Sequence, residues 1–85
     1  MKSLIQPQIN LNGTSKNQLL EQQVEVLEHF RRLLGAMVGA TPHGRDYQLR
    51  PEEYQFARDA WLERYTALDA MYREIEAHAL LLSDA

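Results

Sequence analysis

The chain has 85 residues, of which 45% are hydrophobic and 25% are charged, and its formal net charge is −3 at pH 7. A chain this short forms one small domain that buries little surface, so we expect either very good packing or association with another copy. The absence of cysteine excludes disulfides, thiolate catalysis and thiolate zinc sites, and the acidic balance argues against binding to long nucleic acid.

Residues 1–14 are predicted to form a short extended N-terminal arm, because Ile9 and Leu11 alternate with polar residues between Pro7 and Gly13. We expect contact with another surface to order this arm. The same segment lacks the apolar core of a signal peptide, and no part of the chain approaches 18 consecutive apolar residues. We therefore predict a cytoplasmic protein with no membrane partner.

A first helix is predicted over residues 15–40, where Ser15 and Gln18 have the spacing of a capping box. At about 100° per residue, its apolar side chains fall within an arc of roughly 180°, which is wider than one neighbouring helix covers. We therefore expect it to pack on a second helix and also on another copy of the chain. The row expected in that second contact comprises Leu19, Val26, Phe30, Leu33 and Met37.

A second helix is predicted over residues 51–82. Pro51 is favoured as a first helical residue, and the two glutamates after it suit the positive end of the helix dipole. Apolar residues recur every seven positions over four heptads, which indicates a coiled-coil-like seam. That seam comprises Tyr54, Trp61, Leu68, Ile75 and Leu82, with a second row of Tyr65, Tyr72 and Ala79. Residues 15–85 are therefore predicted to be an all-α, antiparallel two-helix hairpin, assembled as a homo-oligomer.

The stretch GATPHGRDYQLRPEE, residues 39–53, separates the two helices and holds the candidate ligand site. Gly44 permits a positive φ and a tight reversal of the chain. Arg45 and Arg50 offer guanidinium groups suited to bidentate capture of phosphate, and the start of the second helix adds free backbone N–H groups. The predicted ligand-binding residues are Thr41, His43, Gly44, Arg45, Tyr47, Arg50 and Tyr54.

A purely structural interpretation of this loop stays open. Asp46 can pair with Arg45 or cap a turn, and a Pro-x-Gly sequence is an ordinary link between two helices.

No catalytic residue, metal ligand or cofactor is predicted. The pairs Glu25/His29 and Glu74/His78 have i, i+4 spacing, whereas di-iron helical bundles use Glu-x-x-His. The three serines stand in the arm, at the cap of the first helix and in the tail, without the context of a nucleophile elbow. We therefore predict that the protein is not an enzyme.

The turn ATPHGRDYQ resembles that of small phage-encoded helical-hairpin proteins, in which a T-P-x-G-R-[DE] sequence joins two helices. It is similar in particular to the hairpin of anti-CBASS and anti-Thoeris sponges, which sequester cyclic oligonucleotide or cyclic ADP-ribose signals as symmetric oligomers. The matching residues are Thr41, Pro42, Gly44, Arg45 and Asp46, and the likeness extends over about residues 20–80. The resemblance implies ligand binding between protomers, with arginine on phosphates and aromatic rings on bases.

Two functions from different classes follow as hypotheses. The first is a phage-type anti-defence protein in the cytoplasm of an infected bacterial host, which sequesters a cyclic dinucleotide, cyclic trinucleotide or cyclic ADP-ribose signal without catalysis. The alternative is a helical protein-interaction module, an inhibitor or a virion accessory protein, that docks on a protein partner. A heat-stability shift with such nucleotides favours the first, and a stable complex with a protein favours the second.

Overall fold

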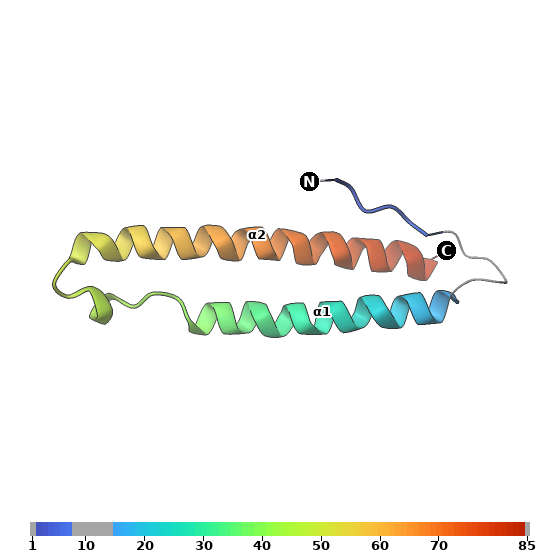
Figure 1. Ribbon diagram of the computed structural model, residues 1–85, viewed down its shortest axis with the longest axis horizontal. Helices are drawn as coiled ribbons and strands as arrows, with labels where there is room; N and C mark the ends of the chain where they lie inside the picture. The colour runs from blue at the N-terminus through green and yellow to red at the C-terminus, as the bar shows by residue number, and fades with distance from the viewer. Residues whose placement is uncertain (1, 8–14, 85) are drawn as a thin grey trace.

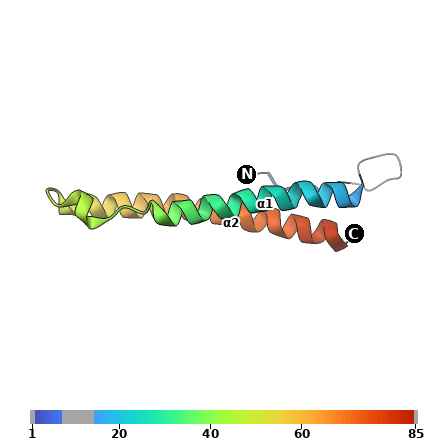
Figure 2. The same ribbon diagram turned by 90° about the horizontal axis from the view of Figure 1, so that it is seen from below.

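The computed structural model describes residues 2–7 and 15–84, which contain two long antiparallel helices and no strand (Figure 1). Helix α1 spans Lys16–Gly39, the short 3₁₀ helix η1 spans Gly44–Tyr47, and α2 spans Pro51–Asp84. The molecule is a rod of 64 × 22 × 16 Å in which the helices cross at a shallow angle (Figure 2). Within the described residues, no helix carries an apolar stretch long enough to cross a membrane. The all-helical prediction is confirmed, and both predicted long helices end within two residues of the observed ones.

The capping box predicted at the start of α1 is present. The Ser15 hydroxyl accepts a hydrogen bond of 3.2 Å from the backbone N–H of Gln18, and the Gln18 side chain accepts one of 3.2 Å from the backbone N–H of Ser15. Each bond satisfies a donor that has no partner inside the helix. The first turn of α1 is therefore held by local side chains before any contact with α2.

The two helices meet along one narrow seam. Its four buried side chains are Leu27 and Leu34 from α1 and Ala79 and Leu82 from α2. Every residue of the predicted heptad rows of α2 is buried or half-buried, whereas Leu80, on another face, is 61% exposed. The predicted seam is confirmed, because residues seven positions apart stay on one face of a helix.

Two aromatic residues of α2 form hydrogen bonds to α1 along the seam. The indole N–H of Trp61 donates a 2.8 Å hydrogen bond to the carbonyl of Met37, in the last turns of α1. Further along, the Arg31 Nε donates to the Tyr72 hydroxyl at 2.7 Å, and this bond raises the pKa of Arg31. The rings of Phe30 and Tyr72 lie 6.1 Å apart on the same level of the hairpin. These bonds fix the register of α1 against α2.

Replacing Trp61 with phenylalanine should lower the free energy of unfolding by about 1 kcal/mol, because it keeps an aromatic ring but removes the donor to the Met37 carbonyl. Urea unfolding followed by circular dichroism measures the change. An unchanged unfolding midpoint would show that this hydrogen bond does not hold the loop end of the hairpin.

The apolar row of α1 that was expected to contact another copy divides into two parts. Leu19, Phe30 and Met37 are half-buried, and the Phe30 ring packs on Tyr72 within the hairpin. Val26 and Leu33 stay 42% and 43% exposed. The hairpin therefore uses the inner edge of the wide apolar arc and leaves its outer edge uncovered.

The described part of the N-terminal segment, residues 2–7, lies beside the C-terminal half of α2 (Figure 1). The Gln6 side-chain amide donates to the ring Nδ1 of His78 at 2.8 Å and to the His78 carbonyl at 3.1 Å. The predicted contacts of Ile9 and Leu11 fall outside the described residues.

Removing residues 2–7 should lower the melting temperature by a few degrees, because the two Gln6 hydrogen bonds to His78 are lost. Differential scanning calorimetry measures it, with Gln22→Ala on the exposed face of α1 as the control. Equal melting temperatures for the shortened and the full chain would mean that the segment contributes nothing to stability.

Candidate ligand-binding site

The connection between the helices begins at Thr41, which closes the C-terminal end of α1. The Thr41 hydroxyl donates to the Val38 carbonyl at 2.8 Å, and its backbone N–H donates to the same carbonyl at 3.2 Å. The last carbonyls of a helix have no partner within it, so this residue ends the helix by satisfying one of them. Thr41 was predicted to contact a ligand. In the structure its hydroxyl already donates its proton to a carbonyl of α1.

His43 organises the turn that follows. Its ring Nδ1 accepts a hydrogen bond of 3.2 Å from the backbone N–H of Arg45, and its carbonyl accepts one of 3.0 Å from the N–H of Asp46. These bonds wind residues 44–47 into the 3₁₀ helix η1. A histidine predicted to contact a ligand therefore acts first as the cap that shapes the loop.

The conformation predicted for Gly44 is wrong. None of the glycines in the described residues has a positive φ, and Gly44 is the first residue of η1. A Cβ added to Gly44 would meet no atom within 4 Å. The chain reverses through a capped 3₁₀ turn, which a side chain at this position does not obstruct.

Tyr47 and Tyr54 join η1 to the first turn of α2. Their ring centroids lie 6.1 Å apart at an interplanar angle of 43°, and both side chains are half-buried. Tilted aromatic pairs at this separation contribute more than their buried area alone. The pair fixes η1 against α2 and presents aromatic surface beside the exposed residues of the loop.

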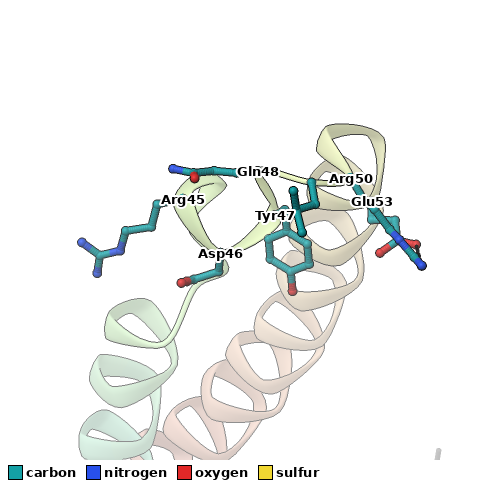
Figure 3. A pocket seen from close by; sticks show the side chains of 7 residues that line it. Arg45, Asp46, Tyr47, Gln48, Arg50 and Glu53 are labelled. Carbon is teal, nitrogen blue, oxygen red and sulfur yellow. Dashed lines mark hydrogen bonds and ion pairs between the residues drawn. The ribbon is translucent and has the colours of Figure 1, made fainter.

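The two arginines of the loop point to opposite sides (Figure 3). Arg50 is paired with Glu53 through a contact of 3.1 Å between Nη1 and Oε1. Arg45 extends from η1 toward the other side, and its exposed guanidinium forms no ion pair with Asp46 within the described part of the chain. One copy therefore does not focus both guanidinium groups on a single anion.

An open hollow of about 410 Å³ lies over this loop. It is lined by Arg45, Asp46, Tyr47, Gln48, Leu49, Arg50 and Glu53. Three predicted site residues line it, namely Arg45, Tyr47 and Arg50. The four others, Thr41, His43, Gly44 and Tyr54, do not line it and belong to the structure that supports it.

Four lining residues were not among the predicted ligand-binding residues, namely Asp46, Gln48, Leu49 and Glu53. Leu49 is 98% exposed. It stands between two polar residues of the turn in the sequence, and this position could have indicated an exposed apolar side chain. Two carboxylates, Asp46 and Glu53, line the hollow together with its two arginines. The two positive and two negative side chains of the hollow cancel within one copy. An anion is therefore attracted by close contact with one guanidinium and not by a broad positive field.

The two Glu/His pairs weighed in the sequence have ordinary structural contacts. Glu25 and His29 lie 3.8 Å apart on the exposed face of α1. The ring Nδ1 of His78 accepts from Gln6, as described above. No group of three metal-ligating side chains occurs in residues 2–7 and 15–84.

Comparison of the chain with protein-family models, with curated proteins and with solved structures found no match.

Proposed function

We propose that the chain is a non-enzymatic, phage-type anti-defence protein that self-assembles and sequesters a small cyclic nucleotide signal in the cytoplasm of an infected bacterial host. The observation that supports this most is the loop end of the hairpin. There Arg45, whose side chain is exposed, and Tyr47 line one hollow, and the Tyr47 ring packs on that of Tyr54 at 6.1 Å between centroids. A guanidinium and aromatic rings at one site are the combination that binds a nucleotide, because the guanidinium binds the phosphate and the rings stack on the base.

Arg45 is the residue best placed to bind phosphate. It projects from η1, and its side chain is free of the carboxylate contact that occupies Arg50. A guanidinium stays charged at any physiological pH and can donate two parallel hydrogen bonds to one phosphate. Arg50 can join it only if the Glu53 contact opens.

A second copy of the chain is part of this proposal. Because the two arginines of one loop diverge, a doubly charged cyclic nucleotide is held best by arginines from two loops. The rod shape of the hairpin supports self-association, since its radius of gyration is 18.3 Å, whereas a compact domain of this length has one of about 12 Å.

One observation favours the alternative, a module that docks on a protein. Leu49 is 98% exposed and Phe56, in the second turn of α2, is 75% exposed. Two large apolar side chains at one end of the rod suit an apolar pocket on a protein partner. They contribute nothing to the capture of phosphate.

A heat-stability screen separates the two functions. The chain is heated alone and with a cyclic dinucleotide, a cyclic trinucleotide or cyclic ADP-ribose, with inorganic phosphate as the control. Nucleotide capture predicts a rise in melting temperature with one of the cyclic nucleotides but not with phosphate, and recovery of that nucleotide unchanged. The protein-docking module predicts no shift with any of them.

A further inference from the structure

The contact between the N-terminal segment and α2 is made through one histidine. The side-chain amide nitrogen of Gln6 lies 2.8 Å from the ring Nδ1 of His78 and donates to the His78 carbonyl oxygen at 3.1 Å. A hollow of about 280 Å³, lined by residues of the segment and of α2, lies at this contact. Gln6 is exposed and His78 is half-buried, so the ring can exchange a proton with the solvent.

The backbone of α2 sets the orientation of the Gln6 amide. A carbonyl oxygen only accepts hydrogen bonds, so the amide must turn its nitrogen, and not its oxygen, toward the His78 carbonyl. The same nitrogen faces Nδ1 and carries only donor hydrogens. Nδ1 must therefore accept, which it can do only in a neutral ring that holds its proton on Nε2. The docked segment thus selects the neutral form of His78.

A protonated ring cannot keep this arrangement. Nδ1 then carries a hydrogen of its own, so two donors face each other at 2.8 Å. Turning the Gln6 amide over would bring its oxygen to the ring N–H, but the same oxygen would then face the His78 carbonyl oxygen. Because either orientation replaces an attraction with a repulsion, protonation of His78 weakens the docking of the segment.

The charged side chains around the ring favour release in the same way. Glu74 precedes His78 by four positions on α2 and lines the hollow. A glutamate four residues before a cation on a helix attracts it, so a protonated ring has a partner on its own helix. Within residues 2–7 the charged side chain is Lys2, whose positive charge opposes a second one on the ring. Helix α1 contributes none of the described residues that line the hollow.

We propose that residues 2–7 form a proton-controlled strap, which lies on α2 while the His78 ring is neutral and leaves α2 when the ring gains a proton. Histidine changes its charge between about pH 5 and 8, so the strap responds within the physiological range. Docking is strongest above this range and is lost as the pH falls through it, because the docked state holds one proton fewer than the released state. The strap needs no ligand and does not depend on the proposed function.

Paramagnetic broadening of NMR signals measures whether the strap is docked. The chain has no cysteine, so Ile5→Cys provides a single attachment point for a nitroxide spin label. Ile5 is 89% exposed, does not line the hollow and stands next to Gln6. At pH 7.5 the label should broaden the backbone amide signals of α2 around His78. The docking constant should fall about tenfold at pH 5.5, so the broadening should drop by about half or more.

Two variants of the labelled chain assign the response to one histidine. In His78→Asn the side-chain oxygen takes a place close to that of Nδ1 and accepts a hydrogen bond at every pH, so the strap should stay docked at pH 5.5. His29→Asn is the matched control. His29 lies on the exposed face of α1, 3.8 Å from Glu25, and this variant should respond to pH as the parent does.

Equal broadening at the two pH values in the labelled parent would overturn the inference, and so would no broadening at either. Release of the His78→Asn strap at pH 5.5 would also contradict it, since another group, or unfolding of the hairpin, would then be the cause. A His29→Asn variant that no longer responds to pH would show that the switch is not at His78.

Discussion

Replacing Leu82 with alanine should lower the free energy of unfolding by about 2–5 kcal/mol, the usual cost of a cavity at a buried leucine. Leu82 is only 1% exposed and is the most deeply buried large side chain of the described residues. It lies near the end of α2. This end of α2 runs beside the first turns of α1 (Figure 1). Since small domains have a total stability near the low end of about 5–15 kcal/mol, the variant should be partly unfolded at body temperature.

The control for this prediction is two residues away on the same helix. Leu80 is 61% exposed, so Leu80→Ala removes the same atoms from a site that one hairpin does not bury. Chemical unfolding of the two variants should give a large loss for Leu82→Ala and little change for Leu80→Ala. Equal losses would show that the single seam between α1 and α2 is not what holds the fold.

The second large effect concerns binding. Arg45→Ala should weaken capture of a responsive cyclic nucleotide by about ten- to a hundredfold, the loss expected for one charge-assisted contact to phosphate. The fold should not change, because the Arg45 backbone N–H still donates to the ring of His43 and the side chain makes no ion pair in the described part of the chain.

Two further variants show which property of Arg45 matters. Arg45→Lys keeps the charge but loses the paired donors, so its affinity should fall between those of the parent and the alanine variant. Arg73→Ala removes an arginine that is paired with Asp69 in the middle of α2, and it should bind as the parent does. If Arg45→Ala binds as tightly as the parent, the loop serves only to connect the helices.

The helices could be predicted because their signals are local and periodic. The capping box at Ser15 needs only two side chains three positions apart, and the seam of α2 repeats every seven residues. The capping box marks where a helix begins, and the heptad repeat specifies which side of a helix meets its neighbour. The observed helix ends and buried residues follow from them.

The loop could be predicted only as a set of residues and not as a geometry. Glycine is compatible with both positive and negative φ, so Gly44 alone did not reveal the 3₁₀ turn that the His43 ring stabilises. The direction of each arginine depends on partners such as Glu53, three residues along α2. The opposite directions of the Arg45 and Arg50 side chains depend on the folded loop, so they could not be predicted from the spacing of the two residues in the sequence.

The account is tested most directly by a calorimetric titration of the unmodified chain with a cyclic dinucleotide, a cyclic trinucleotide and cyclic ADP-ribose. It predicts saturable heat with at least one of the three, and the same nucleotide should be recovered intact afterwards. An absence of saturable heat with all three, from a chain that circular dichroism shows to be helical, would contradict the proposed capture of a nucleotide signal.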